Sequence, residues 1–127
     1  MMIDHIALYT RDLARMRAFY QTYFDGTANT LYHNPKTGLQ TYFISFGDGA
    51  RLELMTRPEL ADCDRSRQWT GWAHLSFRVG TRENVDALTA RLRADGYDVT
   101  SGPRVTGDGY YESCVLDPDG NTVEIVA

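Results

Sequence analysis

The sequence predicts an α+β fold in which a β-α-β-β-β unit occurs twice along one chain. Two observations support this prediction: each half begins with an apolar strand carrying a histidine and ends with a strand carrying a glutamate. The histidines, His5 and His74, are offset by 69 residues, and the glutamates, Glu53 and Glu124, by 71. Such internal similarity is typical of a duplicated structural unit. We therefore expect a single domain over residues 1–127, with approximate repeats at 1–57 and 71–127.

Two segments have the apolar spacing of an amphipathic helix. In the first half, Asp12 is the expected N-cap of a helix whose apolar residues recur every three or four positions through Tyr23. In the second half, Thr81 is the expected N-cap of the corresponding helix. Gly26 and Gly96 follow these segments, and glycine is common just beyond a helix C-terminus. Each half therefore contains one helix after its first strand.

Strand-like runs follow each predicted helix. They cover residues 27–33, 39–46 and 51–56 in the first half, and 97–104, 110–116 and 122–127 in the second. An Asp-Gly pair stands between the last two runs of each half, at 47–50 and 117–121, and such pairs favour a tight reversal of the chain. The last two strands of each half should therefore pair as a hairpin.

Composition narrows the classes of function. The chain has 127 residues, 43% of them apolar and 24% charged, which suits one globular domain. A net charge of −4 with scattered basic residues argues against a nucleic-acid partner. No apolar segment approaches the length of a membrane span, and the N-terminus lacks the pattern of a secretion signal. Cys63 and Cys114 are far apart, so we expect reduced thiols and a cytoplasmic location.

The two histidines and two glutamates stand among apolar residues. Side chains alternate along a strand, so the neighbours of each of the four face the opposite side of the sheet. Asp4 aside, these neighbours are apolar: Ile6, Leu52, Leu54, Ala73, Leu75, Val123 and Ile125. This pattern is consistent with sheets covered by helices on one face, with the histidines and glutamates on the other.

A carboxylate in an apolar strand needs a partner, because burying it unpaired is unfavourable by several kcal/mol. A histidinium, or an arginine such as Arg51 or Arg78, would satisfy this requirement. A divalent metal ion bound by all four residues, His5, Glu53, His74 and Glu124, would satisfy it as well, with charges that cancel. Mixed nitrogen and oxygen ligands suit nickel, cobalt, manganese, iron or zinc. The same placement in both halves favours the metal site.

These segments resemble the vicinal oxygen chelate superfamily, which includes glyoxalase I, extradiol dioxygenases, methylmalonyl-CoA epimerase, and the fosfomycin and bleomycin resistance proteins. The resemblance covers nearly the whole chain and rests on "DHIALYTRDLARMRAFYQTYFDG", "RLELM", "WAHLSFRV" and "DPDGNTVEIV". The last segment, of the form D-P-D-G-N-x-[VIL]-E, is the most specific. The resemblance implies a curled mixed sheet around a central metal, and often a homodimer.

Within the superfamily, the chain most resembles bacterial glyoxalase I. That enzyme uses His, Glu, His and Glu as metal ligands, and His5, Glu53, His74 and Glu124 match this order. The resemblance implies one divalent metal per site, with nickel or zinc favoured. The metal would hold two substrate oxygens and stabilise an enediolate, while Glu124, or Glu53, moves the proton. The implied substrate is a small α-oxoaldehyde–thiol adduct, such as that of methylglyoxal and glutathione.

Four further residues are predicted to line the substrate pocket: Tyr9, Arg11, Trp72 and Arg78. Tyr9 shares a strand face with His5, while Trp72 and Arg78 share one with His74. Arg11 lies close to the place where glyoxalase I has an arginine that holds a glutathione carboxylate. Trp69 is an additional candidate for the same pocket.

Glu112 and Cys114, near the C-terminus, are interpreted as structural residues. Glu112 is expected to point into solvent, and Cys114 to fill core volume.

The main alternative function is another enzyme of the superfamily: an extradiol-type dioxygenase, an epimerase or a thiol transferase. The remaining alternative is a metal-free module that binds a small molecule, in which the histidines and glutamates form a polar core.

Overall fold

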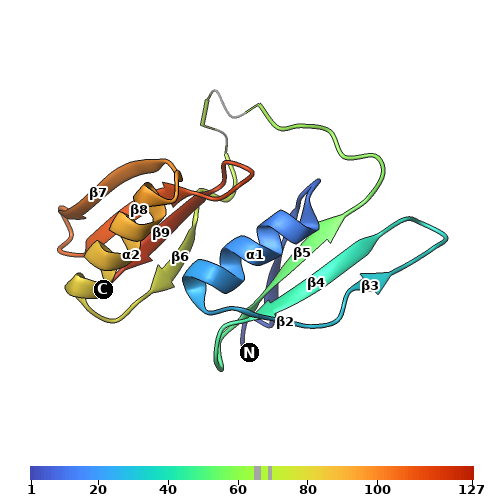
Figure 1. Ribbon diagram of the computed structural model, residues 1–127, viewed down its shortest axis with the longest axis horizontal. Helices are drawn as coiled ribbons and strands as arrows, with labels where there is room; N and C mark the ends of the chain where they lie inside the picture. Colours follow the sequence, from blue (N-terminus) through green and yellow to red (C-terminus); the bar gives the residue numbers. More distant parts are fainter. Residues whose placement is uncertain (65–66, 69) are drawn as a thin grey trace. The chain divides into compact units, whose positions relative to one another are not determined.

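The computed structural model consists of two units, each with a helix lying on one face of a sheet (Figure 1). It describes residues 1–64, 67–68 and 70–127. The units are Met1–Asp64 and Arg65–Ala127. Each contains a first strand, a helix and a set of later strands in the predicted order. The predicted α+β class is therefore confirmed.

The first unit contains β1 (His5–Tyr9), α1 (Leu13–Phe24), β2 (Thr27–Ala28), β3 (Tyr32–His33), β4 (Gln40–Ser45) and β5 (Arg51–Thr56). The strand order is β1-β5-β4-β2, with β3 also paired to β4, and only β1 and β5 run parallel. The expected strand 27–33 is split into β2 and β3. At the break, the Asn29 side-chain oxygen accepts the backbone N–H of Phe43 at 2.8 Å, replacing a ladder bond.

The second unit contains β6 (Leu75–Arg78), α2 (Arg82–Ala94), β7 (Val99–Val105), β8 (Tyr111–Leu116) and β9 (Thr122–Val126). Its strand order, β6-β9-β8-β7, again places the first strand beside the last in a parallel pair. The register is equivalent too, because Ala7 faces Glu53 across β1 and β5 while Ser76 faces Glu124 across β6 and β9. The duplication seen in the sequence is thus reproduced at the level of individual residue pairs.

Both helices begin at the predicted caps. The Asp12 side chain accepts the backbone N–H of Arg15 at 3.0 Å, and Thr81 Oγ1 accepts that of Asn84 at 3.2 Å. These bonds satisfy backbone donors that have no partner within the first turn of a helix. The caps therefore fix where each chain segment turns from its first strand onto the sheet.

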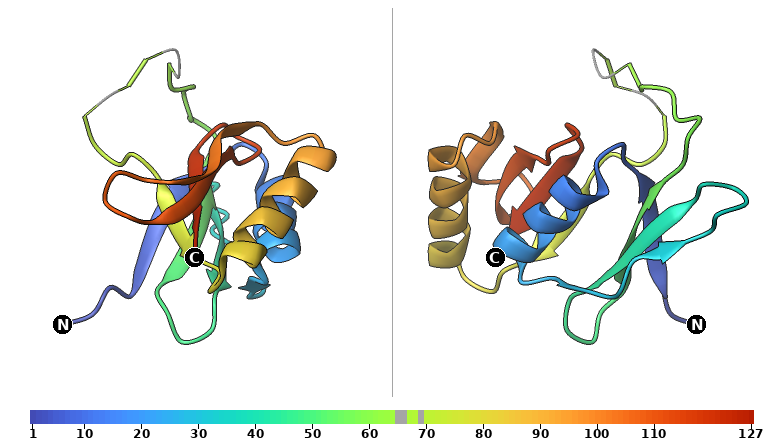
Figure 2. Two further views of the ribbon diagram at one scale, coloured as in Figure 1. Left: turned by 90° about the vertical axis from the view of Figure 1, so that its left-hand side faces the viewer. Right: turned by 45° about the vertical axis from the view of Figure 1, so that its right-hand side comes forward.

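Each helix covers one face of its own sheet (Figures 1 and 2). In the first unit, helix residues Met16, Phe19 and Tyr20 and strand residues Ile44, Leu52 and Leu54 are fully buried. In the second unit, Val85, Leu92, Val115, Val123 and Ile125 are fully buried. Because side chains alternate along the strands, this leaves the histidines and glutamates on the face that carries no helix.

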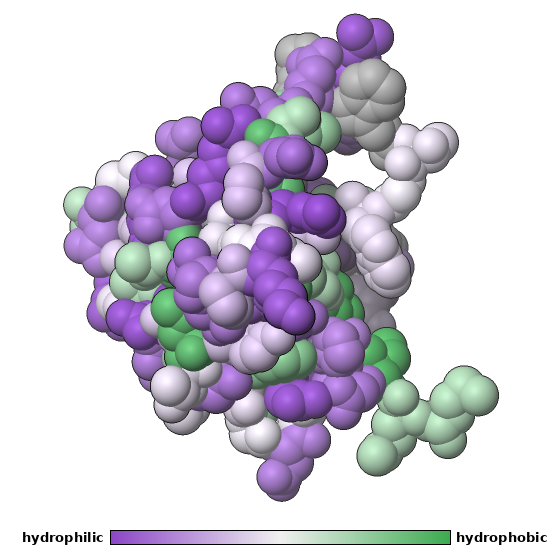
Figure 3. Space-filling view, turned by 90° about the vertical axis from the view of Figure 1, so that its right-hand side faces the viewer, coloured by the Kyte–Doolittle hydropathy of each residue, from purple (hydrophilic) through white to green (hydrophobic). Residues whose placement is uncertain are grey.

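The surface view in Figure 3 is mostly hydrophilic, with apolar atoms in separate areas. Large apolar side chains that are exposed include Met1, Met2, Ile3 and Trp72. Among the described residues, no helix has the length and hydropathy needed to span a membrane.

Candidate metal centre

The first unit brings His5 and Glu53 together. His5 opens β1 and Glu53 lies in the middle of β5, diagonally across the parallel pair. His5 Nε2 lies 3.8 Å from Glu53 Oε2. The Glu53 side chain is only 15% exposed, so its carboxylate is largely withdrawn from water.

The His5 ring is oriented by groups behind it. Its Nδ1 lies 2.7 Å from Asp4 Oδ2, which also accepts a hydrogen bond from Arg51 at 2.5 Å. These two hydrogen bonds, His5 first and Arg51 second, hold the pKa of the Asp4 carboxyl below its ordinary value. An ionised carboxylate can only accept, so Nδ1 is the donor in this hydrogen bond, and Nε2 is the ring nitrogen that faces Glu53. A carboxylate behind a histidine in this way is a common second partner of metal-binding imidazoles.

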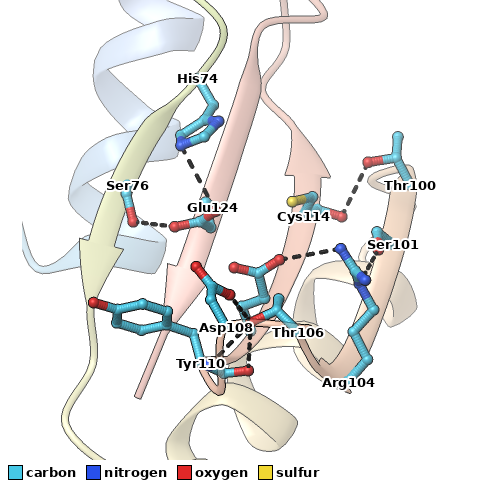
Figure 4. A network of polar contacts seen from close by, with 11 residues as sticks. His74, Ser76, Thr100, Ser101, Arg104, Thr106, Asp108, Tyr110, Cys114 and Glu124 are labelled. Atoms are coloured by element: carbon cyan, nitrogen blue, oxygen red, sulfur yellow. Dashed lines mark hydrogen bonds and ion pairs between the residues drawn. The ribbon is translucent and has the colours of Figure 1, made fainter.

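The second unit brings His74 and Glu124 together in the same manner (Figure 4). His74 immediately precedes β6, and its Nε2 lies 3.6 Å from Glu124 Oε2 on β9. Ser76, directly opposite Glu124, donates its hydroxyl to Glu124 Oε1 at 2.6 Å. The Glu124 side chain is 17% exposed. One carboxylate oxygen is therefore fixed by serine while the other faces the histidine.

The two His–Glu separations are longer than hydrogen bonds. N–H···O hydrogen bonds are typically about 2.7–3.2 Å long, shorter than either His–Glu separation. Two ligand atoms bound at about 2.1 Å to one ion lie roughly 3.0–3.4 Å apart at common bond angles, so both separations would have to shorten on metal binding. Each unit thus brings together one imidazole nitrogen and one carboxylate oxygen, which are both ligand types of a divalent cation.

The arginines considered as alternative partners of the glutamates are bonded elsewhere. Arg51 binds Asp4 and stacks over the Phe43 ring, 4.5 Å from its centroid. Arg78 Nη1 donates to the backbone oxygen of Ala127 at 2.6 Å. Each glutamate instead faces the histidine of its own unit.

The prediction that Glu112 points into solvent is wrong. Glu112 is only 9% exposed and lies 3.3 Å from Arg104 Nη2. The neighbouring Ser113 bonds to Thr89 of α2 at 2.6 Å, so strand alternation turns Glu112 to the face of Glu124. Burial, the nearby Glu124 charge and a hydrogen bond to Glu124 all raise the pKa of the Glu112 carboxyl.

Cys114 does not simply fill core volume. It is half-buried and stands directly opposite Glu124 in the β8–β9 pair. Burial, then the Glu112 and Glu124 charges, raise the pKa of its thiol. The turn at 117–121 is the sequence feature from which the position of Cys114 opposite Glu124 could have been found. Asp117 accepts the backbone N–H groups of Asp119 and Asn121, and this turn sets the register of the hairpin.

The predicted pocket residues have different environments. Tyr9 is exposed on the His5 side of β1, and Trp72 is 91% exposed before β6. Arg11 donates to the Leu60 backbone oxygen at 2.7 Å and pairs with Asp62 at 3.0 Å. Arg11 and Arg78 are therefore already bonded within their own units. Trp69 lies outside the described residues.

The family follows from comparison with known sequences. The sequence profile of the Glyoxalase/Bleomycin resistance protein/Dioxygenase superfamily matches residues 2–125. The chain belongs to this superfamily. The resemblance based on the sequence motifs is thereby confirmed.

Three individual relatives each share at most 29% sequence identity with this chain. The Bacillus subtilis (strain 168) protein YqjT, described as uncharacterized, is 29% identical over 98% of both chains. The trypanothione-dependent glyoxalase I of Leishmania major is 19% identical, with a TM-score of 0.80 over 99% of this chain and 86% of that one. A Listeria monocytogenes FosX fosfomycin resistance protein complexed with Mn(II) is 24% identical, with a TM-score of 0.75 over 98% and 90%. The last two likenesses establish the shared fold.

Proposed function

We propose that this superfamily member is a metal-dependent lyase or isomerase resembling glyoxalase I. The observation that carries the proposal is the equivalent His–Glu pair in each unit, with separations of 3.8 Å and 3.6 Å. One divalent ion, nickel or zinc in our proposal, would be held by His5, Glu53, His74 and Glu124. When bound, the ion would polarise the substrate oxygens and stabilise the charge that develops on them.

Glu124 is the favoured proton carrier and Glu53 the alternative. The reaction removes a proton from one carbon of the substrate and returns it to the adjacent carbon, so one carboxylate can act first as base and then as acid. Ser76 fixes Glu124 Oε1, which leaves Oε2 facing His74. At the equivalent place beside Glu53 stands Ala7, which has no hydroxyl to donate. This difference supports Glu124 as the better positioned group.

The substrate in this proposal is a small α-oxoaldehyde–thiol adduct, and glutathione is one candidate thiol. Tyr9 and Trp72 are exposed and able to contact it. Arg11 and Arg78 would bind a substrate carboxylate only by exchanging their present partners. We further propose a homodimer, on the superfamily resemblance, and a cytoplasmic location, which the free thiols of Cys63 and Cys114 support.

The test combines metal analysis with an isomerisation assay. Tag-free protein is exposed to nickel, zinc, cobalt, manganese and ferrous iron, and the bound metal is counted per chain. We expect about one tightly held ion. The loaded protein should convert the methylglyoxal–glutathione adduct to lactoylglutathione. Glu124→Gln should lower kcat at least roughly 100-fold, and Glu59→Gln, at an exposed position after β5, should not.

Three outcomes would redirect the proposal. Full activity in Glu124→Gln would remove Glu124 as the proton carrier. A strong preference for iron, with oxygen uptake and no isomerisation, would favour the dioxygenase alternative. Failure to bind any of these ions would favour the metal-free binding module.

A further inference from the structure

Strand β8 places two further side chains of types that can bind a metal ion beside Glu124. Cys114 stands directly opposite Glu124, and Glu112 lies two residues away on the same face. One potential ligand atom from each of Glu112, Cys114 and Glu124 can be chosen so that all three lie within 4.8 Å of one another. Figure 4 shows the Cys114 and Glu124 side chains on neighbouring strands, with His74 and Ser76 on the other side of Glu124.

The first unit has no counterpart to these two groups. In the equivalent register, Phe43 stands opposite Glu53 where Cys114 stands opposite Glu124. Thr41 similarly occupies the place that Glu112 has in the second unit. Phe43 offers no metal ligand at all. The thiol and the extra carboxyl are therefore specific to the second unit and do not follow from the duplicated fold.

The charges around Cys114 favour a cation. Two carboxyl groups, Glu112 and Glu124, flank the thiol, and both have side chains that are less than one-fifth exposed. Arg104 contacts Glu112 from β7, but it is 55% exposed and its Nε is bonded to Ser101. With Glu112, Glu124 and a Cys114 thiolate balanced by Arg104 and one divalent ion, the formal charges sum to zero.

We propose that Cys114 is a metal-selecting ligand. Through its sulfur it gives the His74–Glu124 half of the centre a preference for thiophilic ions such as zinc or cadmium over manganese or magnesium. This inference rests on the proposed function, because it assumes that Glu124 binds the metal. The thiol proton passes to solvent as the metal–sulfur bond forms. Thiolate ligands select soft ions, whereas carboxylates alone suit hard ones.

Cadmium titration of the metal-free, full-length chain tests this directly. A cadmium–thiolate bond gives an ultraviolet charge-transfer absorption that carboxylate and imidazole ligands do not produce. The unsubstituted chain and Cys63→Ser should both develop this band, saturating at one cadmium per chain. Cys114→Ser should not, and its preference for cadmium over manganese should fall at least about tenfold. Cys63, the other cysteine, is exposed and serves as the matched control.

The inference is overturned if the unsubstituted chain shows no band, which needs no variant at all. It is also overturned if Cys114→Ser keeps the band or the cadmium preference, or if Cys63→Ser alone loses them. Cys114→Ala repeats the test should the serine variant fail to give native circular dichroism.

Glu124→Gln separates this inference from the proposed function. If folded Glu124→Gln binds both cadmium and manganese like the unsubstituted chain, the metal assignment of the proposed function fails. If it loses both ions while Cys114→Ser keeps the original cadmium preference, only the role of Cys114 fails.

Discussion

Ser76 and Ala7 occupy equivalent places in the two units, and the difference between them makes the two halves of the site unequal. Ser76 donates a 2.6 Å hydrogen bond to Glu124, whereas the Ala7 methyl group leaves Glu53 without this donor. Hydrogen bonds to ionised groups are stronger than those between neutral groups. Ser76 should therefore fix the carboxylate that the proposed reaction depends on.

Replacing this serine tests its role. Ser76→Ala should lower metal affinity about 10- to 100-fold, the usual effect of removing a group that orients a metal ligand. The measurement is competition for zinc with a chromophoric chelator. Ser45→Ala, at a position on β4 paired with Thr27, is the control and should leave zinc affinity unchanged. Equal affinities for both variants and the unsubstituted chain would show that Ser76 does not position Glu124.

Glu112 provides a prediction on stability without metal. Its pKa is raised above the ordinary value of 4.5, chiefly by burial and by Glu124. A carboxyl with a raised folded-state pKa contributes stability below its unfolded pKa, and this contribution is lost as pH rises through the folded pKa. The glutamine of Glu112→Gln stays neutral at every pH, so the variant does not lose this contribution. The unfolding free energy of the variant should therefore rise relative to that of the unsubstituted chain as pH increases above 4.5.

Urea unfolding of the metal-free proteins from pH 4 to pH 8 measures this difference, and Glu59→Gln, at an exposed position, provides the comparison. If the unfolding free energy of Glu112→Gln instead falls relative to that of the unsubstituted chain as pH rises, Arg104 stabilises the ionised Glu112 carboxylate by more than burial destabilises it.

At the scale of elements, Gly26 links α1 to the sheet of the first unit. Asp25 ends the helix in the left-handed conformation, and Gly26 donates its backbone N–H to the Tyr20 oxygen at 3.2 Å. A Cβ at Gly26 would lie 2.5 Å from Ile44 Cγ2. The glycine is required by this close approach of helix end and strand.

Gly26→Ala should therefore lower the unfolding free energy by about 1–3 kcal/mol, because overpacking forces neighbouring atoms to move. Gly107→Ala is the matched control, since a Cβ there meets nothing within 4 Å. Its effect should stay within about 0.5 kcal/mol of zero. Urea unfolding compares the two variants, and equal effects would mean that the Ile44 contact relaxes at little energetic cost.

Much of each unit could be predicted from local sequence, because the signals are local. The Asp12 and Thr81 caps, the helix periodicity and the duplicated order of strands all depend on neighbouring residues. The position of Glu112 depends instead on which face α2 covers and on the register of the β8–β9 hairpin. The Asp-Gly pair predicts the turn at 117–121, but placing Cys114 opposite Glu124 requires the register of the strand pair that the turn connects. The positions of Glu112 and Cys114 therefore depend on strand pairing and helix packing, which the local sequence pattern does not determine.

At the scale of the whole molecule, the His–Glu pairs are divided between two units that each have their own core. Each pair supplies two ligands, fewer than the three or four protein ligands that tightly bound zinc usually has. The proposed four-ligand centre therefore requires both units. A centre completed by Glu112 and Cys114 would require only the second. These two arrangements differ in whether His5 matters for metal binding.

We expect His5→Gln and His74→Gln each to lower zinc affinity at least about tenfold, although the two residues belong to different units. His33→Gln is the control, because His33 lies on β3 of the first unit, outside both the His5–Glu53 pair and the second unit. Zinc competition measures all three variants after circular dichroism has confirmed their folds. If His74→Gln weakens binding while His5→Gln matches the control, the ion is held by the second unit alone. The proposed reaction would then proceed without the ligands of the first unit, and Glu53 would lose its place in it.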